Sequence, residues 1–159
     1  MDKLDYLEKE LSRLLAWIQA ADSRASIILP IDTAMLGLMA ALLPKYICIS
    51  NQMLAFPILA MLLLLFSITC LVFSSFPRTD GPKNSIIFFN GIAKRNINEY
   101  ESSVLNLTIN EYESDLIQQC HINAEIADVK YQWVKRSMAG LFLATPFWII
   151  SIYLLYGLK

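Results

Sequence analysis

The chain has 159 residues, of which 56% are hydrophobic and 17% are charged, and its net charge is −1. This composition excludes an ordinary soluble domain, and the small net charge provides no overall basic field for binding nucleic acid. The hydrophobic residues gather in three long runs with almost no charge, which is the pattern that a bilayer requires. We therefore expect an all-α integral membrane protein with three transmembrane helices and cytosolic helical extensions.

Residues 1–24 are predicted to form a cytosolic amphipathic helix. Its large apolar residues recur at alternating spacings of three and four, which is typical of a coiled-coil seam. The seam consists of Leu4, Leu7, Leu11, Leu14 and Ile18. It packs either on the cytosolic part of the same chain or between copies of the chain, and the pattern does not separate these two possibilities. Because nothing before Pro30 would stop a helix, we expect this one to run straight into the first span.

The first predicted span, residues 25–44, contains a carboxylate, Asp32. A carboxylate inside a span is costly unless it faces protein, water or a partner. Asp32 therefore lies near the membrane interface, is protonated and bonds a neighbouring helix, or faces a pore or gate. The pore interpretation adds Thr33 and Gly37, which give the same span a hydroxyl and a small residue. In a symmetric assembly Asp32 would form a ring of carboxylates that favours cations.

The second predicted span, 53–76, has no charged residue, and the third, 138–158, ends among aromatic residues that favour the headgroup zone. Eleven of the 13 Lys and Arg residues lie before the first span or between the second and the third. By the positive-inside rule, those two segments are cytosolic. We expect a multi-pass protein whose N-terminus is cytosolic.

The long cytosolic segment, residues 77–137, opens with a breaker cluster at 77–82 that turns the chain. A short helix is predicted from Asn98 to Leu105. A long amphipathic helix follows, with Asn110 as its N-cap, and its apolar face continues into the third span.

The sequence contains no recognisable catalytic or metal-binding motif. The single histidine, His121, is interpreted as a solvated or hydrogen-bonded group on the long helix. Three cysteines, Cys48, Cys70 and Cys120, lack the spacing of metal ligands. We therefore expect no enzymatic activity, no metal and no cofactor.

The pair Lys94 and Arg95 is the main candidate for ligand binding. It follows two phenylalanines and Asn90, and guanidinium, amide and ring together suit the phosphate and base of a nucleotide. A solvated charge pair would leave the same pattern. Arg24 is a further candidate, because it begins the first span and could link binding to gating.

Three groups of residues, in their order and spacing relative to the spans, resemble the Pycsar effector family, the small transmembrane effectors of bacterial antiphage signalling. They are Ala21-Asp22-Ser23-Arg24-Ala25-Ser26, Phe88-Phe89-Asn90-Gly91 with Glu99-Tyr100, and the long helix that reaches Lys130. The resemblance covers nearly the whole chain. It implies an effector in the bacterial inner membrane that senses a nucleotide-derived signal made by a partner nucleotidyltransferase or cyclase. Such an effector then damages the membrane and halts growth of the infected cell.

Some family members carry a separate cyclic-nucleotide domain, for which this chain is too short. In this respect it is similar to the compact effectors of Hailong-type systems, in which a short single-stranded DNA oligomer holds a membrane channel shut. The implied ligand is a cyclic mononucleotide or such an oligomer. Because three spans cannot enclose an aqueous path, we expect a homo-oligomer, with a tetramer as the working assumption, that forms a gated ion-conducting pore. A non-channel anchor or regulatory subunit of the partner nucleotidyltransferase is the alternative.

Overall fold

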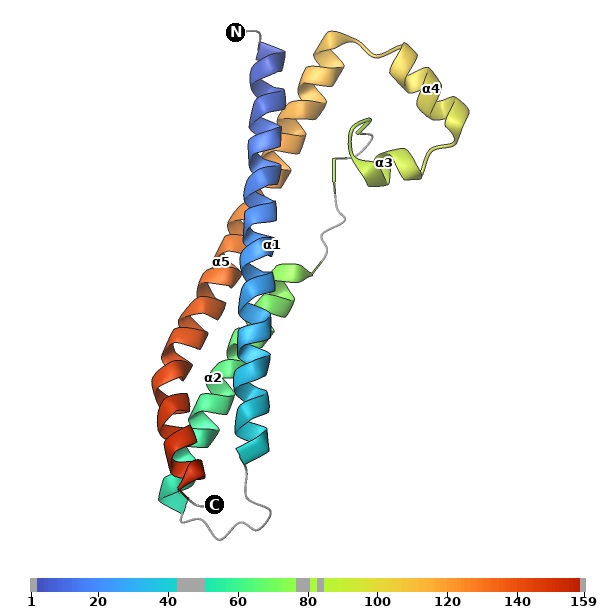
Figure 1. Ribbon diagram of the computed structural model, residues 1–159. Helices are drawn as coiled ribbons and strands as arrows, with labels where there is room; N and C mark the ends of the chain where they lie inside the picture. Colours follow the sequence, from blue (N-terminus) through green and yellow to red (C-terminus); the bar gives the residue numbers. More distant parts are fainter. Residues whose placement is uncertain (1–2, 43–50, 77–80, 83–84, 158–159) are drawn as a thin grey trace. The chain divides into compact units, whose positions relative to one another are not determined.

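The computed structural model describes residues 3–42, 51–76, 81–82 and 85–157, and its elements are all α-helices. They are α1 (Lys3–Leu42), α2 (Asn51–Ser75), α3 (Phe89–Ala93), α4 (Ile97–Leu105) and α5 (Ile109–Tyr156) (Figure 1). The expected all-α class is confirmed. The predicted breaker cluster at 77–82 lies mostly outside the described residues, and Cys48 lies wholly outside them.

The chain divides into two compact units, and α1 and α5 each contribute to both. Unit 1 comprises Met1–Ala21 and Pro77–Val129, and unit 2 comprises Asp22–Phe76 and Lys130–Lys159. α1 is one helix of 40 residues and α5 is one helix of 48, so neither is interrupted between extension and span. Three helices, α1, α2 and α5, are long and apolar enough to cross a membrane, as the sequence predicted.

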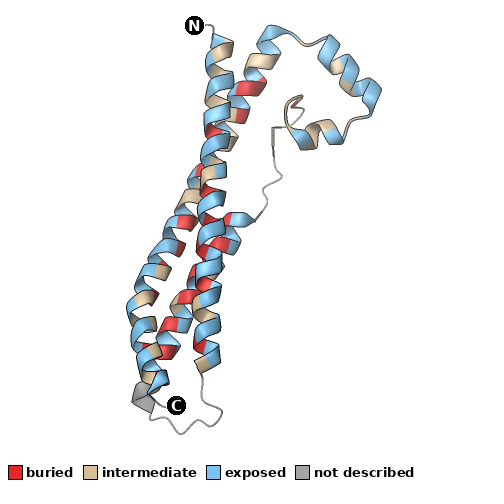
Figure 2. Ribbon diagram, viewed as in Figure 1, coloured by how far each residue is buried: buried red, intermediate tan, exposed pale blue. Residues whose placement is uncertain are grey.

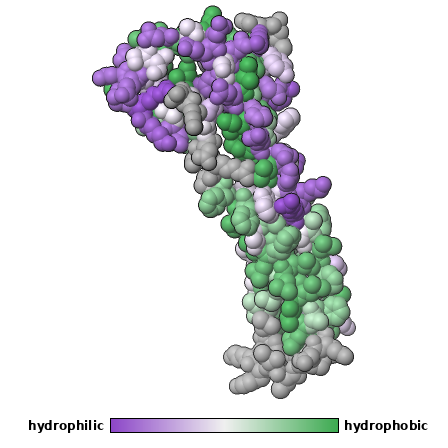
Figure 3. Space-filling view, turned by 180° about the vertical axis from the view of Figure 1, so that it is seen from behind, coloured by the Kyte–Doolittle hydropathy of each residue, from purple (hydrophilic) through white to green (hydrophobic). Residues whose placement is uncertain are grey.

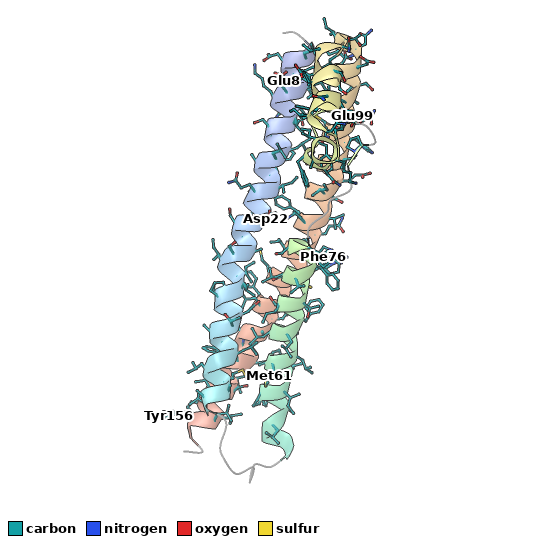
Figure 4. All side chains as sticks on the ribbon, turned by 90° about the vertical axis from the view of Figure 1, so that its right-hand side faces the viewer. Glu8, Asp22, Met61, Phe76, Glu99 and Tyr156 are labelled. Carbon is teal, nitrogen blue, oxygen red and sulfur yellow. The ribbon has the colours of Figure 1, made fainter. Side chains whose placement is uncertain are left out.

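Unit 2 is a bundle of these three helices with a closely packed centre. Its core holds Met39, Ala60, Leu64 and Ala144, which are at most 2% exposed. Most of the outer side chains of α2 are also apolar, and Phe76, directly after this helix, is 68% exposed (Figure 4). Hydrophobic residues accordingly cover the visible face of unit 2, whereas hydrophilic residues gather on unit 1 (Figure 3). Such an extended apolar surface suits contact with lipid.

In unit 1 the first turns of α1 pack against the first turns of α5. Leu14 of the predicted seam is 5% exposed, and the other seam residues are half-buried. Cys120 Sγ donates to the carbonyl oxygen of Leu7 at 3.6 Å, and the Tyr112 hydroxyl donates to Glu8 Oε1 at 2.9 Å. Burial, and then the hydrogen bond to Glu8, raise the pKa of Tyr112. Within one chain the seam therefore faces the chain's own α5, and a further role between copies stays a prediction.

The helices α3 and α4 contain no buried residue, in contrast to the red stripes along α1, α2 and α5 (Figure 2). Asn96 caps α4 in a capping box: Glu99 N donates to Asn96 Oδ1 at 2.9 Å, and Asn96 N donates to Glu99 Oε2 at 3.2 Å. The short helix thus begins one residue earlier than the predicted start at Asn98.

The predicted N-cap of the long helix, Asn110, is wrong, because α5 begins at Ile109 and Thr108 precedes it. Thr108 N and Oγ1 both donate to Glu111 Oε2, at 2.9 and 2.7 Å. The side-chain bond first, and then the backbone bond, lower the pKa of Glu111. Glu113, which would complete an equivalent capping box for Asn110, instead forms an ion pair with Lys3.

Candidate functional site

The predicted ligand residues fall in both units. Asn90 lies in α3, Lys94 is the C-cap of that helix, and Arg95 follows it, so these three are close together in unit 1. Lys94 is exposed, whereas Asn90 and Arg95 are half-buried. Arg24 belongs to unit 2. The structure therefore groups the three residues of unit 1 and places Arg24 in a different setting, described below.

A buried polar network ties the segment before α3 to α5. Asp115 of α5 is 8% exposed, and its Oδ2 accepts from Ser85 Oγ at 3.0 Å and from Ile86 N at 2.9 Å. Gln119, one turn further along α5, donates from Nε2 to Ser85 Oγ at 3.0 Å. Ser85 Oγ in turn accepts from Phe88 N at 2.9 Å. This network holds the backbone directly before the predicted ligand residues, and sequence reasoning missed it.

The Phe-Phe-Asn-Gly motif is built around close packing. A Cβ added to Gly91 would lie 2.6 Å from the carbonyl oxygen of Ser85, which leaves no room for a side chain. The Phe88 ring packs directly against the backbone of Gly81 in the same way. The motif therefore holds the first residues of α3 close to the segment that precedes the helix. Lys94 is exposed at the other end of α3.

Within unit 2, the Ala-Asp-Ser-Arg-Ala-Ser segment of α1 contacts α5 through two charged side chains. Asp22 forms an ion pair with Lys130 (Asp22 is labelled in Figure 4). Two residues later, the Arg24 guanidinium lies 5.3 Å from the centroid of the Tyr131 ring, in cation–π geometry. Asp22 and Arg24 thus bind consecutive residues of α5, which gives this segment a structural role in joining the two helices.

Asp32 is buried inside unit 2, with no exposed surface. Ser67 Oγ of α2 donates to Asp32 Oδ2 at 2.6 Å. The same Ser67 oxygen lies 2.9 Å from Ser137 Oγ and 3.0 Å from Ser137 O on α5. Within the chain Asp32 therefore bonds a neighbouring helix, and through Ser67 it links α1, α2 and α5, while a role of Asp32 in a pore between copies stays a prediction.

Thr33 and Gly37, the other predicted pore residues, lie on the outer surface of α1. Thr33 Oγ1 donates to its own helix at Leu29 O over 2.9 Å, and a Cβ added to Gly37 would meet nothing within 4 Å. Because Asp32 faces inward, the three predicted pore residues do not share one face of the helix.

No group of three His, Cys, Asp or Glu side chains within the described ranges could hold a metal ion. His121 is exposed, with its Nε2 atom 3.3 Å from Glu125 Oε1, as suits the predicted surface group.

The family model of the Pycsar effector protein domain matches residues 6–157. The chain belongs to the Pycsar effector family. It is thus a membrane effector of antiphage cyclic-nucleotide signalling, and Pycsar effectors respond to a cyclic nucleotide made by a partner cyclase. The resemblance seen in the sequence is confirmed. No curated protein and no solved structure matches the chain.

In this Pycsar effector the residues that sequence reasoning missed are mainly polar partners. Ser67 bonds both Asp32 and Ser137, and Asp115 anchors the segment before α3. A serine in an otherwise apolar span is a weak signal of such a bond, because Ser is common in membrane helices. Asp115 gave a clearer signal, since a carboxylate beside the predicted apolar face of a helix needs a partner.

Proposed function

We propose that this Pycsar effector self-associates in the inner membrane into an ion-conducting pore. A nucleotide signal gates the pore from the cytosolic side, and the resulting ion flow halts growth of the infected cell. One observation carries the proposal: the centre of the bundle is filled, with Leu64 and Ala144 0% exposed and Met39 2% exposed. A single chain has no room there for water, so ions must pass between copies.

The outer face of α1 is the surface best suited to border such a path. Ser26, Pro30, Thr33 and Gly37 are exposed and follow one another at spacings of four, three and four, which places them on one face of the helix. The outer face of α2 carries mostly large apolar side chains by comparison, with Ile58 53% and Leu62 58% exposed, and its exposed polar residues are Thr69 and Ser75 near its end. Thr33 and Gly37 would therefore line the path. Asp32 would act from inside the bundle by holding α1 on its neighbours.

Lys94, Arg95 and Asn90 are proposed to bind the signal. Lys94 is exposed and Arg95 is half-buried, and cationic side chains form charge-assisted hydrogen bonds with phosphate, worth about 1.5 to 3 kcal/mol each. Because α1 and α5 run without interruption from unit 1 into unit 2, ordering of unit 1 by a ligand would act on helices that also form the spans. The signal would be a cyclic mononucleotide or a short single-stranded DNA oligomer, and the distribution of basic residues supports a cytosolic position for unit 1.

The test is ion flux through liposomes that contain the purified protein, with cyclic mononucleotides or short single-stranded DNA added. We expect flux that one of these ligands changes, and an at least tenfold weaker response in Lys94→Gln with Arg95→Gln, because the loss of two such bonds exceeds about 1.4 kcal/mol. The control is Lys9→Gln with Arg13→Gln, which removes the same charge from ion-paired residues of α1. Absence of flux under every condition would favour the anchor alternative.

A further inference from the structure

We propose that a groove on the outer surface of unit 2 binds one anionic phospholipid of the bilayer, with its phosphate at Arg24 and Lys135. The groove has a volume of about 520 Å³, and its lining includes Arg24 of α1 and Tyr131, Lys135, Met138, Ala139 and Phe142 of α5. The proposal goes beyond the pore function and does not depend on it.

One end of the groove is cationic. Arg24 and Lys135 are both exposed, and neither forms an ion pair within the part of the chain that the structure describes. The lining contains no carboxylate, and the nearby Asp22 is already paired with Lys130. Tyr131 holds the Arg24 guanidinium 5.3 Å from its ring centroid, which limits where that cation can move. Two cations that line one groove, with no carboxylate in its lining, suit a phosphate group.

The other end of the groove is apolar. Met138, Ala139 and Phe142 continue along α5 from Lys135, and Phe142 is 69% exposed. The rise from Lys135 to Phe142 is about 10 Å along a helix, comparable to the passage from headgroup to hydrocarbon. An amphiphile with a charged head and an apolar tail matches both ends. Free phosphate or a nucleotide would use only the cationic end and leave the apolar end unoccupied.

The position of the groove favours lipid over a second copy of the chain. Its apolar end lies on the outer face of a helix that is apolar enough to cross the membrane, so acyl chains are the solvent there. Basic side chains at such a boundary attract anionic headgroups. From the sequence, Arg24 was a candidate for binding the phosphate of the nucleotide signal. In the groove, Arg24 would instead bind the phosphate of a lipid.

The test is native mass spectrometry of the full chain in detergent, with phosphatidylglycerol or phosphatidylcholine of the same acyl chains added. We expect the parent to retain phosphatidylglycerol with a preference of at least about tenfold. Arg24→Gln and Lys135→Gln should each lower that preference to about threefold or less, and Lys135→Arg should keep it. Phe142→Ser should weaken retention of both lipids equally.

The matched control is Arg136→Gln, which removes a neighbouring charge of α5 whose guanidinium lies 4.7 Å from the Trp133 ring and does not line the groove. Equal retention of the two lipids by the parent, or an equal loss in Arg136→Gln, would overturn the proposal. Displacement of phosphatidylglycerol by millimolar inorganic phosphate would assign the cationic end to free phosphate. A change in oligomer mass in Phe142→Ser, with lipid retention unchanged, would assign the groove to a second copy. None of these readouts depends on ion flux, so failure here leaves the pore proposal untouched.

Discussion

Asp32 lies between three helices because two serines and a glycine let those helices approach one another. Ser67 reaches the carboxylate at 2.6 Å and the Ser137 hydroxyl at 2.9 Å. Gly140, one turn after Ser137, is tightly packed as well, since an added Cβ would lie 3.1 Å from the Phe66 ring. Small residues and shared hydrogen bonds are the usual means by which membrane helices associate without a hydrophobic driving force.

Ser67→Ala should therefore destabilise the bundle. The substitution removes the hydroxyl that bonds Asp32 and leaves both carboxylate oxygens buried without a partner, a loss of about 1 to 3 kcal/mol. Thermal unfolding in detergent, followed by tryptophan fluorescence, would measure the change. Thr69→Ala is the control on the same helix, because Thr69 Oγ1 is exposed and bonds only its own helix, at Leu65 O over 2.8 Å. If the two variants unfold at the same temperature, the Asp32–Ser67 bond does not stabilise the bundle.

Among the elements, α1 shows a single register from end to end. The apolar seam at its start continues through buried residues at the same alternation of three and four, and these include Asp32. The buried members are Leu14, Ala21, Ala25, Ile28, Asp32 and Met39. The inward direction of Asp32 was therefore predictable from the sequence by extending the seam past Ile18. The prediction that Asp32 lines a pore rested on the residue types of the first span and did not consider which face of the helix each residue occupies.

Leu14→Asp and Leu15→Asp test which face of α1 packs within the chain. Leu14 is 5% exposed and Leu15 is 50% exposed, so only the first substitution places a charge in the contact with α5 in unit 1. Leu14→Asp should cost at least about 2 kcal/mol and speed proteolysis of unit 1, whereas Leu15→Asp should stay within about 0.5 kcal/mol of the parent. Limited proteolysis and oligomer mass in detergent would be measured together. A lower oligomer mass in Leu15→Asp, with unit 1 intact, would place an interface between copies on the outer face.

Not every element was open to prediction from local pattern. The long helices were predictable because apolar periodicity and length specify them directly. The five-residue helix α3 was missed because it is too short for a periodic pattern. Its position depends on contacts outside the helix: the hydrogen bonds of Asp115 to the segment before it, and the close approach of Gly91 to Ser85. The cap of α5 was misplaced because both Thr108 and Asn110 are followed by Glu three residues later. The choice between them involves Glu113 and its ion pair with Lys3, far away in sequence.

At the scale of the whole molecule, the proposed pore would depend on how copies of the chain meet. Two paths compete: the ring of Asp32 carboxylates predicted from the sequence, and a path lined by Thr33 and Gly37. Asp32 has no exposed surface, so a charge there is separated from any path between copies by its own bundle. Asp32→Asn keeps an oxygen that can accept from Ser67 and should leave the reversal potential in a salt gradient unchanged. Weaker cation preference in a correctly assembled Asp32→Asn protein would return Asp32 to the pore.

Cysteine accessibility locates the path itself. In a background with Cys48, Cys70 and Cys120 replaced, Thr33→Cys and Gly37→Cys should react with a water-soluble thiol reagent and lose current, because their outer positions would border water. Leu36→Cys is the control on the same turn, since Leu36 packs on the core of Met39, Ala60 and Leu64 and should stay unreactive. Reaction must depend on the open state, so the same ligand that changes the flux should change the rate of modification. Equal reactivity at Leu36 and Gly37 would mean that the α1 face does not line the path, and that ions pass along another surface of the assembled bundles.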